Sequence, residues 1–329
     1  MERRTLGNTG LEISKLGYGA ASLGNIYRDI DESEGTRSVH AAIDAGINYF
    51  DVAPLYGFTL AEKRLGEALE GRRDDVIIAT KCCRDKFDVF DFSAERVAAS
   101  MDESLSRLKT DYIDVFQIHD VEFGTFEQVV NETIPAAMKL KESGKARFVG
   151  ITGLPVRYLR KVTEATGQFD TLLSWGHCTL IEDEMETELA ELCREKGIGL
   201  MTCSPLLQGL LTDNPPPEWH RSPDVVKAGV NELAAVCKEY NTDLATVALK
   251  YAVDNPHVAT NVVGMSTASK VARNVKALET TTNAELLDRL LEIAQPIKNM
   301  MWFEGNPDNN IPPSDPNQYV PQSPAQTHE

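Results

Sequence analysis

One pattern runs through most of this chain: a short apolar run is followed by a longer amphipathic run, eight times in succession. Short apolar runs between turn residues are typical of buried strands, and longer runs with apolar residues at helical spacing are typical of helices. We predict strands at residues 16–20, 48–52, 76–81, 112–118, 146–151, 171–175, 198–203 and 261–265. We predict helices near residues 33–45, 60–70, 93–107, 126–143, 155–166, 183–196, 225–253 and 268–277.

This alternation favours one α/β domain, a closed parallel (β/α)8 or TIM barrel, over two separate domains, because no composition break divides the chain. A doubly wound sheet is the alternative. It would need a Gly-x-Gly-x-x-Gly turn after the first strand, whereas the glycines here stand at 17, 19 and 24. That spacing does not match, so the barrel is the better prediction.

The barrel is expected to carry additions at both ends. Gly-Asn-Thr-Gly at 7–10 lies between two polar–apolar alternations and predicts an N-terminal β-hairpin within 5–13. Residues 283–294 predict an extra C-terminal helix. We therefore expect the barrel to occupy 1–300, followed by a polar, Pro/Asn/Gln-rich and loosely ordered tail at 301–329.

The composition limits the partners. The chain has 329 residues and a formal net charge of −17, and an acidic balance argues against nucleic acids and anionic membranes. No run approaches the ~18 apolar residues of a membrane span, and residues 1–7 lack the apolar core of a secretory signal. Without a CxxC pair the cysteines are expected to be reduced thiols in a cytoplasmic protein. They stand at 82, 83, 178, 193, 203 and 237.

Polar residues stand at the carboxyl ends of three consecutive predicted strands. Asp51 ends the second strand and Tyr56 lies on the following loop, Lys81 ends the third strand, and His119 follows the fourth. Each alone has an ordinary explanation, such as a solvated lysine or a hydrogen-bonded structural histidine. The carboxyl ends of barrel strands meet at one rim, where active sites lie. Four polar groups converging there predict a catalytic site.

The residue types suggest a tuned acid–base group. An unperturbed tyrosine titrates near pH ~10, too high for a base at neutral pH. A neighbouring ammonium stabilises the phenolate and lowers this pKa, so turnover should rise with pH through the Tyr56 pKa. Lys81 is then the tuning cation, Asp51 holds Lys81, and His119 donates to a substrate oxygen.

With these four residues in their order along the chain, the sequence resembles the aldo-keto reductase superfamily over nearly all of its predicted ordered part. The resemblance implies an (α/β)8 barrel that binds an extended nicotinamide cofactor without a Rossmann motif. It also implies hydride transfer between the cofactor and a carbonyl or alcohol carbon. Asp51, Tyr56, Lys81 and His119 match the catalytic tetrad of that superfamily one for one.

Other segments are similar to the plant L-galactose dehydrogenases and their bacterial sugar-dehydrogenase relatives. This likeness implies NAD-dependent oxidation of an aldose of the L-galactose or L-fucose type at C1, giving the lactone. Tyr56 would take the C1 hydroxyl proton as the hydride leaves. The segments that carry this resemblance are 46–51, 59–63, 91–97, 119–124, 150–155 and 216–220.

Candidate sugar-binding residues lie near these segments. Asp120 and Glu122 are expected to bind sugar hydroxyls, although a plain loop carboxylate is an equal alternative. Trp175, His177 and Trp219 are candidate pocket residues, because a flat apolar ring suits the C–H face of a sugar; for Trp175 a core position is the alternative.

The resemblance also assigns cofactor contacts. Thr152 and Ser174 match the carboxamide-binding positions, and Cys203 falls where many members place an aromatic residue that stacks on the nicotinamide, which is a departure. Gly264 falls where NADP-dependent members often carry a lysine, which favours NAD over NADP. Lys270 and Arg273 could still meet a 2′-phosphate, or are exposed helix charges. The remaining expected contacts are Ser204, Leu206 and Gly209 at the pyrophosphate and Ser266 and Asn274 at the adenosine.

Two other functions stay open at this point: an NADPH-dependent reductase of small aldehydes or ketones, and a cofactor-sensing regulatory subunit with little turnover. The intact tetrad argues against the second. We expect no metal site, because His119, His177 and His220 lie on different segments without metal-ligand spacing. The long connection at 204–224 is expected to cover the active site. The partner is expected to be a small-molecule sugar or aldehyde, with the protein a monomer or small homo-oligomer.

Overall fold

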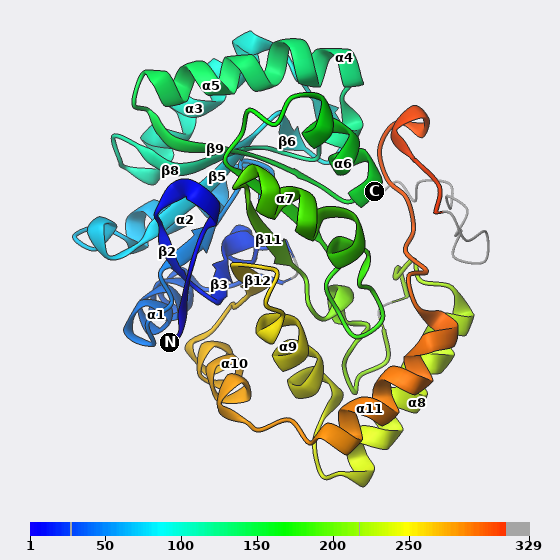
Figure 1. Ribbon diagram of the computed structural model, residues 1–329. Coiled ribbons are helices and arrows are strands. Elements are labelled where there is room, and N and C mark those ends of the chain that lie inside the picture. The colour runs from blue at the N-terminus through cyan, green and yellow to red at the C-terminus, as the bar shows by residue number, and fades with distance from the viewer. Residues whose placement is uncertain (27, 217, 314–329) are drawn as a thin grey trace.

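In a computed structural model that describes residues 1–26, 28–216 and 218–313, eight parallel strands form a closed barrel (Figure 1). Going around the ring, the order is β10-β11-β12-β3-β4-β5-β8-β9. The predicted fold class is confirmed, because each predicted strand has a counterpart in this ring. The strands are β3 Leu16–Gly19, β4 Tyr49–Asp51, β5 Ile77–Cys82, β8 Ile113–Ile118, β9 Ala146–Gly153, β10 Thr171–Trp175, β11 Gly199–Cys203 and β12 Thr260–Gly264.

Helices form an outer layer around this ring (Figure 1). Two of their starts follow capping rules: Asp31 accepts hydrogen bonds from the amides of Ser33 and Glu34, and Ser93 accepts one from the amide of Arg96. The helices around the barrel are α1 Glu32–Asp44, α2 Leu60–Ala68, α3 Ala94–Leu108, α4 Phe126–Gln128, α5 Ile134–Glu142, α6 Val156–Ala165, α7 Glu191–Lys196, α9 Leu244–Asp254 and α10 Ala268–Glu279.

The single helix predicted at 225–253 is wrong: the structure has α8 Asp224–Glu239 and then α9. Asn241 between them adopts a left-handed conformation with φ of 55°, and Asp243 caps α9 by accepting from Thr246 N. The predicted extra helix is α11, Ala284–Ala294, which lies beside α8 at one edge of the molecule (Figure 1). Apolar side chains of α8, α9 and α11 form a second core cluster there.

The N-terminal hairpin is present as β1 Arg3–Thr5 and β2 Glu12–Ser14. Leu6 between these strands is fully buried, and a Cβ on Gly199 at the start of β11 would overlap it at 2.5 Å. The hairpin therefore closes the N-terminal end of the barrel. A second hairpin, β6 Arg84–Lys86 and β7 Val89–Phe90, follows β5 and has no counterpart among the predicted elements.

The first part of the segment predicted to be a loose tail is packed. Met301 and Trp302 are buried. Asn309 donates from Nδ2 to the carbonyl oxygens of Glu122 and Gly124, both at 2.8 Å. Residues 301–313, the red segment of Figure 1, thus contact the loop after β8. The rest of the predicted tail, 314–329, lies outside the described residues.

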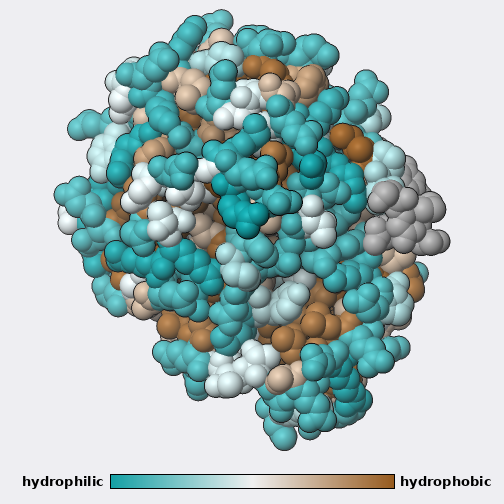
Figure 2. Space-filling view, viewed as in Figure 1, coloured by the Kyte–Doolittle hydropathy of each residue, from teal (hydrophilic) through white to brown (hydrophobic). Residues whose placement is uncertain are grey.

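The face of the molecule in Figure 2 is mostly hydrophilic, with apolar side chains in scattered groups. Within the described ranges, none of the helices combines the length and the apolar character needed to cross a membrane. All six cysteines are free thiols, as predicted.

One glycine contact positions the loop after β4, and it gives a first prediction. Gly57 has φ of 63°, and an added Cβ would lie 2.1 Å from Gly24 O. We expect Gly57→Ala to lower the free energy of unfolding by more than the ~1–2 kcal/mol that left-handed backbone alone costs. Gly71, with φ of 76° and nothing within 4 Å, makes Gly71→Ala the control for strain without a clash. Urea unfolding of both variants measures the difference; equal losses would contradict the close packing.

Candidate active site

The parallel strands bring all four predicted catalytic residues to one rim. Asp51 is the last residue of β4, Lys81 lies near the end of β5, and His119 follows β8 directly. These three strands are neighbours in the ring. Tyr56 lies on the loop after β4, where its amide donates to Ala53 O at 3.1 Å.

Lys81 is the centre of this group. It is 2 % exposed, and its Nζ donates to Asp51 Oδ1, to Val52 O at 3.0 Å and to Tyr56 Oη at 3.3 Å. An ammonium has three hydrogens, and the three acceptors account for all of them. Gln117, in β8, donates from Nε2 to Asp51 Oδ2 at 3.0 Å and so holds the other carboxylate oxygen. The phenol oxygen therefore faces a fixed cation.

His119 is a neutral imidazole in this setting. Burial lowers the pKa of His119 to about 3. Its ring is perpendicular to the Tyr56 ring, with centroids 6.0 Å apart, and among the described residues its Nδ1 has no hydrogen-bond partner. A neutral imidazole carries one N–H, so it can donate to an oxygen placed beside Tyr56.

A second charged group lies next to His119. Asp120, with a left-handed backbone, pairs with Arg84 of hairpin β6–β7, and its Oδ2 is 3.6 Å from His119 Nε2. Arg84 is itself clamped, because its guanidinium lies 5.0 Å from the ring centroids of both Phe90 and Phe123. Asp120, a predicted substrate residue, is thus held in a fixed orientation.

The C-terminal segment adds side chains that the sequence did not identify. Glu304 Oε1 accepts from Trp302 Nε1 at 3.2 Å and pairs with Arg221 at 2.7 Å. Burial raises the pKa of Glu304, an effect to which the nearby Asp120 adds. These residues lie in segments without helical or strand periodicity, so no sequence signal marked them. Gln117 could have been found, since it is a polar residue within an otherwise largely apolar strand.

The other predicted substrate residues divide into two groups. Trp175, at the end of β10, is half-buried with its ring 5.8 Å from that of Trp302, and Trp219 is 41 % exposed and stacks on His220. Glu122 is fully buried; its Oε1 accepts from Leu154 N at 2.9 Å, and burial raises its pKa well above the usual range.

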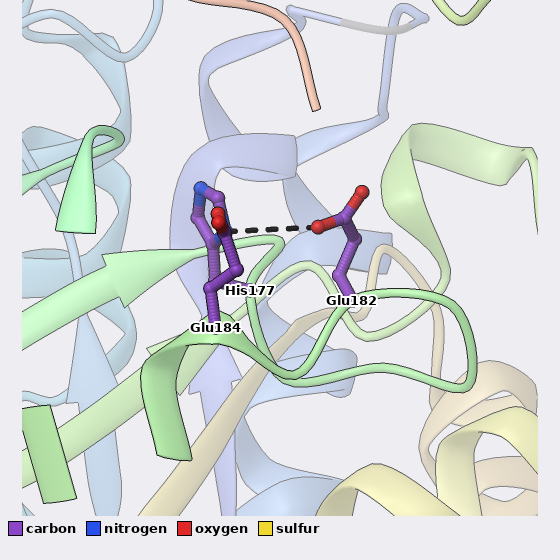
Figure 3. Close-up of side chains that lie close together, drawn as sticks. All are labelled: His177, Glu182 and Glu184. Carbon is purple, nitrogen blue, oxygen red and sulfur yellow. Dashed lines mark ion pairs between the residues drawn. The ribbon is translucent and has the colours of Figure 1, made fainter. Parts of the chain in front are cut away.

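His177 belongs with Glu122 in the second group. Its side chain is buried beside Glu182 and Glu184 (Figure 3). Glu122 and His177 are therefore buried among other protein groups, whereas the rings of Trp175 and Trp219 retain exposed surface.

The predicted carboxamide residues lie on the same rim. Thr152 and Ser174, in β9 and β10, are buried, and Thr152 Oγ1 accepts from Asp120 N at 3.1 Å. Ser174 Oγ donates to Leu154 O at 3.2 Å, which leaves its oxygen as an acceptor. Cys203 ends β11; desolvation raises the pKa of its thiol to about 12, so it is uncharged.

The loop after β11 and the end of β12 have room for a ligand. Gly209, with φ of 96°, and Gly264 would each place a Cβ with no heavy atom within 4 Å. Ser204 also has a left-handed backbone, Leu206 is half-buried, and Ser266 and Asn274 are buried.

A basic cluster adjoins Ser266. Arg28 Nη2 lies 3.4 Å from Ser266 Oγ, and desolvation together with Arg28 and Arg273 lowers the pKa of Lys270. Arg28, which lies just before α1, and Lys270 and Arg273 of α10 give three cations in a chain of net charge −17, and such a cluster suits an anionic ligand. The open glycines and this cluster fit an extended nucleotide cofactor. Arg28 was not among the predicted contacts.

Residues 15–295 match the sequence profile described as the Aldo/keto reductase family. The chain belongs to this family. It is 42 % identical over 314 residues to L-galactose dehydrogenase of Arabidopsis thaliana, covering 93 % of this chain and 98 % of that protein. It is 31 % identical to D-threo-aldose 1-dehydrogenase of a Pseudomonas species, over 81 % of this chain and 90 % of the other.

A solved structure agrees with these relatives. The holo form of an aldo-keto reductase from Bacillus halodurans superimposes with a TM-score of 0.76 and 30 % identity, covering 89 % of this chain and 96 % of that chain. The protein is therefore an oxidoreductase of the aldo-keto type that uses a nicotinamide coenzyme.

The protonation state of the His119 imidazole gives a second prediction. We expect its ring to stay neutral between about pH 5 and 8, the range in which a solvated imidazole ordinarily changes charge. An unfolded histidine binds a proton near pH ~6.5, so burying His119 costs stability increasingly as the pH falls below that value toward 3. NMR titration of the imidazole nitrogens measures this. A His119 signal that titrates near the ordinary value of ~6.5 would contradict the burial.

Proposed function

We propose that this protein oxidises an aldose of the L-galactose or L-fucose type at C1 to the aldonolactone, with NAD as coenzyme. The single observation that carries the proposal is the fixed Lys81 ammonium 3.3 Å from the Tyr56 oxygen, on a rim shared with His119. The likeness to two sugar dehydrogenases supports the choice of an aldose.

Tyr56 is the base in this proposal. The ammonium stabilises a phenolate at Tyr56, and that phenolate takes the proton of the C1 hydroxyl. The nicotinamide, when bound, accepts the hydride that leaves C1, so the cyclic sugar loses one hydride and one proton and becomes a lactone. His119, as a neutral donor, orients the same oxygen through its N–H.

The groups around the rim suit a polyhydroxylated substrate. Asp120 and Glu304 offer carboxyl oxygens and Arg84 offers N–H donors, and their electrostatic interaction indicates that they lie close together. Trp175 and Trp219 retain exposed aromatic surface that suits the C–H face of a sugar. A small aldehyde needs few of these polar groups.

The charges between α1 and the start of α10 support NAD over NADP as the coenzyme. Arg28 lies 3.6 Å from Glu34, and Glu34 also interacts with Lys270. A carboxylate there can accept from a ribose hydroxyl and repels a 2′-phosphate. Gly264 has open space where a side chain would stand, and as a glycine it offers no cation to a 2′-phosphate. The second candidate function is an NADPH-dependent reductase of small aldehydes, favoured by Arg28, Lys270 and Arg273 if they bind the phosphate.

The base assignment is tested by substitution. We expect Tyr56→Phe to lower kcat by about 10²–10⁴-fold, the usual contribution of a general acid–base residue, with little change in folding. Tyr251→Phe is the matched control, since Tyr251 lies on α9 away from the rim and loses the same hydroxyl. Steady-state kinetics and the unfolding midpoint are measured for both. Full activity in Tyr56→Phe would exclude a phenolate base.

The substrate is tested with a panel. With L-galactose or L-fucose and NAD, the absorbance of the reduced coenzyme is expected to increase. This rate should exceed the rate with NADP and the rate at which NADPH reduces a small aldehyde. The reverse order would favour the reductase.

The proposed sugar site is tested by substituting the Asp120 carboxylate. Asp120→Asn should raise KM for the sugar by about tenfold, the effect of weakening one charge-assisted hydrogen bond, while the KM for NAD changes little. Asp111→Asn, at an exposed position before β8, is the control. An unchanged sugar KM in Asp120→Asn would remove Asp120 from the sugar site.

A further inference from the structure

Outside the rim tetrad, three ionisable side chains converge on the loop that follows β10. His177, Glu182 and Glu184 are each at most 6 % exposed. His177 Nδ1 lies 3.3 Å from Glu184 Oε2 and 3.8 Å from Glu182 Oε2, and the three atoms all lie within 4.8 Å of one another. In Figure 3 His177 and Glu184 stand together and Glu182 reaches toward them from another part of the loop.

Two of the atoms that face one another lack a hydrogen bond of ordinary geometry, although His177 Nδ1 is within 3.3 Å of Glu184 Oε2. Among the described residues, neither His177 Nδ1 nor Glu182 Oε2 makes a hydrogen bond, although both are buried. Leaving such an atom without a partner costs about 1–3 kcal/mol, so a ligand between them is favoured. Glu184 differs, because its Oε1 is held by Arg157 while Oε2 points at His177.

We propose that His177, Glu182 and Glu184 bind one divalent transition-metal ion, of the Zn²⁺ or Mn²⁺ type. One imidazole nitrogen and two carboxylate oxygens form a mixed N/O donor set that suits these ions better than Ca²⁺ or Mg²⁺. An ion about 2.0–2.2 Å from each ligand atom requires ligand atoms roughly 3–4 Å apart, which matches the two measured separations.

Charge and space also fit. Burial and the neighbouring Glu184 raise the pKa of Glu182 well above its usual range, although Arg157 and Lys298 oppose this rise, and a divalent ion beside Glu182 would favour its ionised form. A cavity of about 20 Å³ adjoins the cluster, lined in part by His177, Glu184, Asn299 and Trp302. That volume accommodates one water molecule, which would supply a further ligand.

The site would be structural. The loop is joined to the C-terminal segment, because Asn299 N donates to Ile181 O and Asn299 Nδ2 donates to Asp183 Oδ1, both at 2.9 Å. An ion held by His177, Glu182 and Glu184 therefore fixes this loop and, through Asn299, the segment that carries Trp302 and Glu304 to the rim.

The test uses the full chain, dialysed against a chelator and titrated with Zn²⁺. We expect one Zn²⁺ per chain by calorimetry and a rise in Tm, since binding to the folded state alone stabilises it. Glu182→Gln keeps the side-chain shape and should weaken Zn²⁺ binding about tenfold or more and abolish the rise in Tm. Glu188→Gln is the matched control, because Glu188 pairs with Arg157 and Arg160 outside the cluster.

A second readout separates ligand loss from misfolding. Co²⁺ in place of Zn²⁺ should give visible absorption bands in the wild type and in Glu188→Gln, altered or lost in His177→Gln. No stoichiometric binding of Zn²⁺ to the wild type, or equal binding by Glu182→Gln, would overturn the proposal.

Discussion

The buried ammonium of Lys81 is the interaction on which the working rim of this barrel depends. It is fully hydrogen-bonded, by a carboxylate, a backbone carbonyl and the Tyr56 oxygen. A cation this deeply buried is tolerated only with such partners, and removing the Asp51 carboxylate would cost about 3–5 kcal/mol. The contacts that satisfy the buried Lys81 side chain are therefore the same contacts that place it beside the Tyr56 oxygen.

The ring of strands explains why this arrangement is rigid. Asp51 pairs with Ala79 in register, and Lys81 pairs with Gln117, so the carboxylate, the ammonium and the amide come from three adjacent strands. Tyr56 is on the loop after β4, and the close contact between Gly57 and Gly24 holds that loop. Parallel strands deliver side chains to one edge by geometry alone, which is how residues far apart in sequence meet.

The same geometry explains what could be predicted from the sequence. Eight periodic repeats specify the ring, and the tetrad follows because its members close consecutive strands. Arg84, Trp302 and Glu304 were missed because they lie in segments whose position depends on tertiary packing rather than on a local period. The break between α8 and α9 was also missed, although Asp243 carried a capping signal. Glu182 and Glu184 lie in the connection after β10, where no regular spacing indicates that they meet His177.

Hairpin β6–β7 and the segment 301–313 lie outside the ring of strands. Arg84 and Glu304 reach the rim from these attachments. Lys81 and its partners belong instead to the ring of strands and to the loop after β4. Substitutions in these two attachments can therefore change the charges around the rim without moving the strands that hold Asp51, Lys81 and Gln117.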